Sequence, residues 1–502
     1  MDGFLIGIQE LFQIANISFL VVGVIIGLIV GTLPGMNDNI TIAVLIPVTF
    51  GMEPQHAMML LVGIYCATAF GGSFPAILLK IPGTASSIVT TIDGYEMKKN
   101  GLAGQALGIS TVSSTIGGII SGITLLFLSP VLASVALKFG PVEYFSLIIL
   151  GLCTVIGMAK GNGIKSMIAV LIGLIISIIG ISPQTGYARF TFGSTSLLDG
   201  INLVPLMIGL FGVTAIFELF DVPKVRQTDA GILPKKEKVG RILPDKRLFK
   251  KILPTALYSS GLGTVIGVLP GAGMIMAVYM AYDQAYRRLQ KKVKNFGKGT
   301  PEGVAAPEAA NNAVVASSMV PLISLGVPGN SVSALFIGAL MIHGLQPGPS
   351  LFENSPEISY LLIIGFLAAY VFIFPFGIIM AKFLTSTILK VPKELLGAGI
   401  AILCFTGAYA FQNNLFDLWI IIIFGVIGYL FNKFNIPFSA LILAVVLGNL
   451  LETSYQQSMV LSDESPLVFL QEPISLSLLI VSFLFIIYPI ISGIISRYRS
   501  AS

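Results

Sequence analysis

The sequence predicts an all-α polytopic membrane protein built from two inverted-topology repeats. Of its 502 residues, 55% are hydrophobic and 11% are charged, whereas roughly a quarter of the residues in a soluble domain carry charge. Mean hydropathy is +0.91. Residues 101–137 and 309–352 contain no Asp, Glu, Lys or Arg, and each stretch exceeds the ~20 apolar residues of a membrane helix. Two motifs that recur in the second half of the chain indicate the repeat.

Composition also excludes several classes of function. The net charge of +5 comes from polar loops and implies no nucleic-acid partner. Three cysteines and two histidines are too scattered to predict a disulfide framework, a metal site or another cofactor. The first Lys or Arg of the chain is Lys80, so we expect no cleaved signal peptide. Because acid, base and metal-binding residues do not converge in any familiar spacing, we expect no enzymatic activity.

A basic segment divides the chain. Residues 221–251 hold ten Lys or Arg and four acids, and positively charged loops favour the cytoplasmic side of a membrane. We therefore predict four parts: a first membrane repeat over 1–220, a basic cytoplasmic linker over 221–251, a second, inverted membrane repeat over 252–471, and a C-terminal transmembrane helix with a short cytoplasmic tail over 472–502.

Two motifs recur in the same order on both sides of the linker. G-x-x-x-G-x-L-P-G occurs at 27–35 and at 263–271, and P-x₆-P-G occurs at 75–83 and at 321–329. Two matching motifs in one order indicate an internal repeat rather than chance use of Gly and Pro.

The distribution of basic residues predicts that the repeats are inverted. The loop at 51–56 has no Lys or Arg, whereas its equivalent at 287–298 is strongly basic. The bias then reverses, because Lys98 and Lys99 have no basic counterpart in residues 343–357. Equivalent loops thus lie on opposite sides, with the N-terminus outside and the C-terminus in the cytoplasm. We expect about 11–15 membrane segments, some of them re-entrant hairpins.

The Pro-Gly pairs mark the expected binding site. Such a pair breaks a helix and leaves backbone N–H and C=O groups without their helical partners. Within a membrane, unpaired groups of this kind are tolerated where they line a cavity. Four breaks in repeat-related positions are typical of a transporter that binds its solute at helix tips, although a single pair can be a simple kink. The candidate substrate-binding residues are Gly35, Asn37, Ser73, Lys80, Pro82, Gly83, Thr84, Gly271, Gly273, Asn311, Asn312, Gly329, Asn330 and Ser331.

Charged residues near the breaks have two interpretations each. Lys80 is either a counter-charge for an anionic substrate or a lysine that extends to the membrane interface. The candidate ion-coupling residues for Na⁺ or H⁺ are Asp38, Asn39 and Glu308. For the two acids, the alternatives are that the side chain caps a helix or lies in a loop beside the basic segment. Helix N-termini with hydroxyl and amide groups suit a carboxylate.

The sequence resembles the large, TctA-like membrane subunit of the tripartite tricarboxylate transporter family. The most specific segments are P-E-A-A-N-N-A at 307–313, G-V-P-G at 326–329 and H-G-L-Q-P-G-P at 343–349. The resemblance implies a secondary transporter that imports tri- or dicarboxylates such as citrate across the bacterial inner membrane by symport and alternating access. It also implies a small integral membrane subunit and a periplasmic solute-binding protein as partners.

Another class of membrane protein stays open from the residues alone. The alternative is a channel-like or uncoupled permease component for another small anionic solute. No ring-of-charge motif favours a channel. The chain contains no G-x-x-x-x-G-K-[ST] motif, so direct coupling to ATP is not expected.

Overall fold

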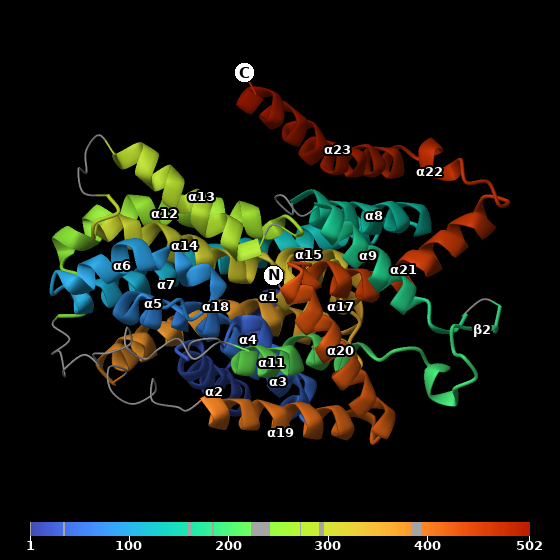
Figure 1. Cartoon of the computed structure of the whole chain (residues 1–502), viewed down its shortest axis with the longest axis horizontal. Coiled ribbons are helices and arrows are strands. Elements are labelled where there is room, and N and C mark those ends of the chain that lie inside the picture. Colours follow the sequence, from blue (N-terminus) through green and yellow to red (C-terminus); the bar gives the residue numbers. More distant parts are fainter. Residues whose placement is uncertain are drawn as a thin grey trace.

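The structure is a computed structural model that describes residues 2–33, 36–158, 163–182, 185–221, 241–271, 273–290, 296–383 and 393–501. Within these ranges the chain is almost entirely helical, which confirms the prediction of an all-α polytopic membrane protein. The two strands found there, β1 (Gly180–Ile181) and β2 (Ala188–Arg189), form a short antiparallel hairpin. This hairpin lies at the opposite end of the molecule from α6 (Figure 1).

Six helical segments of the described chain are long and apolar enough to cross a membrane. They are α2 (Ile14–Gly31), α4 with α5 (Pro54–Gly71 and Ser73–Leu79), α7 (Ala103–Ala136), Leu203–Phe220, α18 (Pro356–Phe383) and α20 (Leu415–Lys433). Six further apolar helical stretches of 10–17 residues lie within the described chain. Which of these segments cross the membrane and which are re-entrant stays a prediction.

The remaining elements of the first half are α1 (Asp2–Leu11), α3 (Asp38–Leu45), η1 (Ile46–Thr49), η2 (Ala85–Ile88), α6 (Thr90–Lys99), α8 (Pro141–Met158), α9 (Gly163–Ser177), η3 (Thr195–Leu197), α10 (Leu203–Met207), the π-helix η4 (Ile208–Val213) and α11 (Thr214–Asp221). Those of the second half are α12 (Lys246–Val268), α13 (Gly273–Leu289), α14 (Pro301–Ser317), α15 (Met319–Leu325), α16 (Ser331–Ile342), α17 (Pro349–Asn354), α19 (Lys393–Gln412), α21 (Phe438–Leu461), α22 (Val468–Gln471) and α23 (Pro473–Ala501).

The segment predicted as a linker over 221–251 is helical at both of its ends. Asp221 is the last residue of α11, and α12 begins at Lys246. The start of α12 is fixed by Asp245, whose carboxylate accepts a hydrogen bond of 2.7 Å from the backbone N–H of Leu248. Such an N-cap satisfies an otherwise unpaired donor of the first turn. Residues 222–240 lie outside the described part.

Equivalent helices of the two halves pack in equivalent ways. α2 packs on α4, and α12 packs on α14. A Cβ added at Gly27 would lie 2.5 Å from the carbonyl oxygen of Ile64, and one at Gly263 would lie 2.5 Å from that of Ala310. Small residues let membrane helices approach closely, so the recurring G-x-x-x-G motif serves the same helix contact in each half. Inversion of one half relative to the other stays a prediction.

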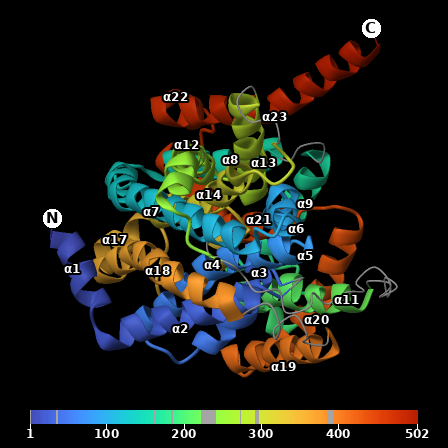
Figure 2. The ribbon, with the colours of Figure 1, turned by 90° about the vertical axis from the view of Figure 1, so that its left-hand side faces the viewer.

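The helices form two groups that meet near the centre. One group contains α2, α4 to α7, α12, α14 and α18, and the other contains α8, α9, α21 and α23, while α19 and α20 pack on each other and on η4. α21 packs against both α8 and α9, and α23 covers α8 (Figure 1). Figure 2 shows α23 and α19 on opposite outer faces of the molecule. The N-terminal ends of α3, α13 and α16 lie at the boundary between these groups and line the cavity there.

Candidate functional site

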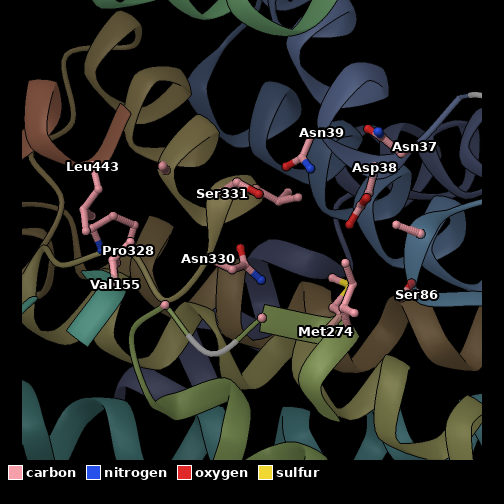
Figure 3. A pocket seen from close by; sticks show the side chains of 16 residues that line it. Asn37, Asp38, Asn39, Ser86, Val155, Met274, Pro328, Asn330, Ser331 and Leu443 are labelled. Atoms are coloured by element: carbon pink, nitrogen blue, oxygen red, sulfur yellow. The ribbon is translucent and has the colours of Figure 1, made fainter. Parts of the chain in front are cut away.

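A cavity of about 250 Å³ lies between the two helix groups. Its polar side chains come from the starts of α3, η2 and α16, and Met274 and Ile275 come from the first turn of α13. Val155 of α8 and Leu443 of α21 close the cavity from the other group (Figure 3). The lining residues are Asn37, Asp38, Asn39, Ala85, Ser86, Val155, Gly271, Gly273, Met274, Ile275, Pro328, Asn330, Ser331, Val332, Ala334 and Leu443.

Each of the four helix starts at the cavity follows one of the predicted Pro-Gly breaks. The first break, Pro34-Gly35, lies outside the described residues, so the predicted site residue Gly35 cannot be placed. α3 begins three residues after that break, and α13 begins two residues after Gly271. The first N–H groups of a helix have no partner within the helix and carry partial positive charge. The cavity therefore concentrates backbone donors.

The caps of η2 and α16 are built in the same way. Thr84 and Asn330 each form a capping box with the residue three positions later, Ser87 and Ser333 respectively. In the second box, Oδ1 of Asn330 accepts a hydrogen bond of 2.8 Å from the backbone N–H of Ser333. The Asn330 amide nitrogen donates to the Tyr65 hydroxyl at 3.0 Å. These contacts fix the orientation of Asn330 in the cavity wall.

Asp38 is the one charged side chain among the described residues that line the cavity. It is buried, with 9% of its surface exposed, and it extends into the same space as Asn330 (Figure 3). The neighbouring Asn39 has a buried Oδ1 without a hydrogen-bonding partner among the described residues. A carboxylate and a free amide oxygen are ligands that suit a small cation. The same cavity thus offers N–H donors and oxygen acceptors.

Glu308 lies in a separate buried cluster. Its carboxylate accepts hydrogen bonds from the hydroxyls of Thr90, Ser110 and Ser114, the latter two at 2.8 and 3.1 Å. The Ser110 hydroxyl also contacts that of Ser73 at 2.8 Å. Ser73 and Glu308, both predicted site residues, are therefore brought together, but neither lines the cavity.

The two asparagines of α14 also lie away from the cavity lining. The Asn311 amide donates to the carbonyl oxygen of Ala69 at 2.9 Å, and the Asn312 amide donates to that of Glu308 at 3.1 Å. The Tyr370 hydroxyl donates to the Asn312 carbonyl oxygen at 3.2 Å. In this conformation the Asn311 side chain holds α14 against α4, and the Asn312 side chain bonds within α14.

Gly83 and Gly329 pack against backbone instead of lining the cavity. A Cβ at Gly83 would lie 2.7 Å from the carbonyl oxygen of Gly31, and one at Gly329 would lie 2.6 Å from that of Ser318. Both contacts are closer than carbon atoms tolerate. These glycines allow each tip to fold back on its own half. Pro82 precedes η2 and Thr84 is its N-cap residue. Neither residue lines the cavity.

Lys80 is exposed at the C-terminal end of α5, in the left-handed conformation with φ 61°. Its ammonium group lies 5.7 Å from the centre of the Tyr95 ring. Lys80 does not line the cavity. The structure thus brings together seven of the predicted residues: Asn37, Asp38, Asn39, Gly271, Gly273, Asn330 and Ser331.

Several lining residues were not predicted from the sequence. Ser86 belongs to the polar run after the second break, and that run marks it in the sequence as a hydroxyl at the tip. Val155 and Leu443 lie within apolar helices and carry no such signal.

Comparisons with known proteins agree with this architecture. Residues 17–443 match the model of the "Tripartite tricarboxylate transporter TctA family". The chain is 36% identical over 496 residues to an uncharacterized 52.8 kDa protein in the TAR-I ttuC' 3'region of Agrobacterium vitis, covering 98% of this chain and 96% of that protein. It is 35% identical over 239 residues to an uncharacterized protein in the TAR-II ttuC' 3'region of the same organism, covering 47% of this chain and 96% of that protein. The chain therefore belongs to the tripartite tricarboxylate transporter TctA family.

Proposed function

We propose that the chain is the large membrane subunit of an ion-gradient-driven symporter that imports organic acids, tri- or dicarboxylates, across the bacterial inner membrane. The observation that carries this proposal is the convergence of four helix starts on one cavity. The carrier works by alternating access, with the N-terminus outside and the C-terminus in the cytoplasm. A periplasmic solute-binding protein delivers the substrate, and a small integral membrane subunit completes the complex.

The carboxylate binds at the starts of α13 and α16. Backbone N–H groups there meet an anion without a buried lysine or arginine, and no basic side chain of the described residues lines the cavity. Asn330 and Ser331 add an amide and a hydroxyl. The cavity volume of about 250 Å³ suits a small polar solute, since sites for drug-sized ligands usually exceed 300 Å³.

The coupling ion binds at Asp38 and Asn39. Two like charges 4 Å apart repel each other by about 4 kcal/mol at an effective dielectric constant of about 20, or about a thousandfold in affinity. An ionised Asp38 therefore disfavours a carboxylate in the same cavity until Na⁺ or H⁺ neutralises it. This electrostatic dependence couples substrate entry to the ion gradient.

Glu308 is a second ion-coupling group in this proposal, for a proton. Its hydroxyl partners can donate to a carboxylate or accept from a carboxylic acid, so the cluster accommodates both protonation states. Comparing Glu308→Gln with Asp38→Asn under a proton gradient and under a Na⁺ gradient assigns the ion to one site or the other. Loss of proton-driven uptake alone in Glu308→Gln supports this role, and unchanged uptake under both gradients removes it.

The test is uptake of labelled citrate and succinate into membrane vesicles that contain the complete complex. We expect saturable uptake that requires a Na⁺ or proton gradient, and we expect Asp38→Asn to lose the dependence on that gradient. Asp199→Asn, an exposed acid outside the cavity, is the matched control. Non-saturable flux that ignores both gradients would favour the alternative of a channel-like or uncoupled permease for another anion.

A further inference from the structure

A second cavity of about 240 Å³ continues from the first. Asn37, Asn39 and Ser331 line both cavities, so the two spaces share one wall of polar side chains. From there the second cavity extends past Ala215 to Glu218. Its lining residues are Asn37, Asn39, Ile40, Phe211, Thr214, Ala215, Glu218, Ser331, Asn432 and Phe438. A solute bound at the tips therefore borders an extended space rather than a closed chamber.

The far end of this second cavity lies on the predicted cytoplasmic side. Glu218 is three residues before the end of α11, which leads into the basic linker, and Asn432 is the penultimate residue of α20. α20 ends in Lys433, and the ammonium group of Lys165 donates to the carbonyl oxygen of Phe434 at 2.7 Å. Basic residues at helix ends favour the cytoplasmic face.

The wall of the second cavity contains an irregular helix. η4, which supplies Phe211, is π-helical, and π-helical turns are frequent at functional sites. The Phe211 ring contacts that of Phe438 edge to face, with 5.8 Å between centroids. A Cβ at Gly209 of η4 would lie 2.7 Å from the carbonyl oxygen of Ile421. This close packing on α20 keeps one side of the passage fixed.

Glu218 is the one charged residue among the described residues that line the second cavity. The Asn432 amide donates a hydrogen bond to its carboxylate, and no lysine or arginine of the described ranges is part of the lining. A carboxylate at the mouth attracts a cation and repels a free organic anion. The passage thus has one acid at each end, Asp38 inside and Glu218 at the mouth.

We infer that the second cavity is the cytoplasmic exit of the transport path and that the Glu218 carboxylate, oriented by Asn432, is the transient binding site of the coupling cation as it leaves. This inference rests on the proposed function for the existence of a transported solute. It adds to that function a passage from the central cavity to the cytoplasm and a second cation site at Glu218. The described conformation is then one in which the central cavity communicates with the cytoplasm.

The first test is the sidedness of chemical labelling, which does not require transport. The native cysteines Cys66, Cys153 and Cys404 are buried, so they provide a low background. Asn432→Cys, at an exposed position of the cavity lining, should react with a membrane-impermeant methanethiosulfonate reagent in inside-out vesicles and not in right-side-out vesicles. Ser196→Cys, at an exposed position outside both cavities, reports general reactivity, and Glu53→Cys, exposed in the loop at 51–56 that is expected outside, is the control with the opposite sidedness. Labelling of Asn432→Cys from the outside alone would overturn the exit path.

The second test concerns the cation. Glu218→Gln should raise the Na⁺ or proton concentration for half-maximal uptake severalfold while leaving the KM for citrate or succinate unchanged. Asp199→Asn should change neither value. An unchanged ion dependence of Glu218→Gln, in a complex that still shows gradient-driven uptake, would overturn the cation site. Absence of gradient-driven uptake in the unmodified complex would instead contradict the proposed function, so the two failures are distinguishable.

Discussion

Lys80 and Gly326 end equivalent helices in the same left-handed conformation. α5 and α15 each contain seven residues, and φ is 61° at Lys80 and 73° at Gly326. Both residues lie two positions before the proline of the second Pro-Gly pair. A glycine adopts this conformation without strain, whereas a side chain makes it costly. The tip geometry is therefore retained in the first half despite an unfavourable residue.

Lys80→Gly should stabilise the protein by about 1 kcal/mol, because it removes the steric cost of a side chain in the left-handed region. Because Lys80 is outside the cavity lining, we expect the KM for citrate or succinate to stay unchanged. Thermal unfolding of the purified complex and uptake assays give the two values. A clear rise in KM would restore Lys80 as a counter-charge for the substrate.

Gly83→Ala and Gly329→Ala should destabilise the protein to similar extents, by about 1–3 kcal/mol each, because an added methyl group meets backbone atoms in both tips. The two glycines face equivalent neighbours. Gly83 approaches Gly31, and Gly329 approaches Gly267, which holds the same place in the G-x-x-x-G-x-L-P-G motif, as well as Ser318.

The control for these two variants is Gly261→Ala. A Cβ at Gly261 in α12 would have no neighbour within 4 Å, so alanine should stabilise the helix by about 1 kcal/mol or less. Thermal unfolding of all three variants provides the comparison. A tip variant as stable as the unmodified protein would show that its glycine is not required for the fold-back.

Glu53→Cys and Lys298→Cys should be labelled from opposite sides of the membrane. Both residues are exposed, and they follow Gly51 and Gly297, which share a positive φ of 78° and 86°. Inversion of the repeats puts the first cysteine outside and the second in the cytoplasm. Impermeant maleimide on right-side-out and inside-out vesicles makes the measurement. Labelling of both from one side would refute the inverted topology.

The sequence allowed much of the site to be predicted because helix breaks in a membrane protein are rare and need partners. Pro-Gly pairs beside Asn37, Asp38, Gly271 and Asn330 marked the helix starts that line the cavity. Gly83 belongs to the same motif, but it packs against the backbone of Gly31 and Gly72. The residues of this turn that line the cavity are Ala85 and Ser86. Motif membership therefore predicts the turn and does not tell which of its residues faces the cavity.

Other parts of the site depend on contacts between distant segments. Glu308 meets Thr90 and Ser110 across about two hundred residues of chain, and only the packing of α14 against α6 and α7 brings them together. Val155 and Leu443 reach the cavity because α8 and α21 pack against each other. Neither arrangement follows from local patterns, because apolar residues in apolar helices look alike.

The central claim is that a carboxylate and its coupling cation bind together in the cavity lined by the four tips, and alkylation of Ser331→Cys tests it most directly. Ser331 is partly exposed and lines the cavity. We predict that citrate or succinate slows alkylation of this cysteine in vesicles only when Na⁺ or an acidic medium is also present, while Ser196→Cys reacts at a constant rate. An alkylation rate that no combination of carboxylate and cation changes, in a variant that still accumulates solute, would contradict the account.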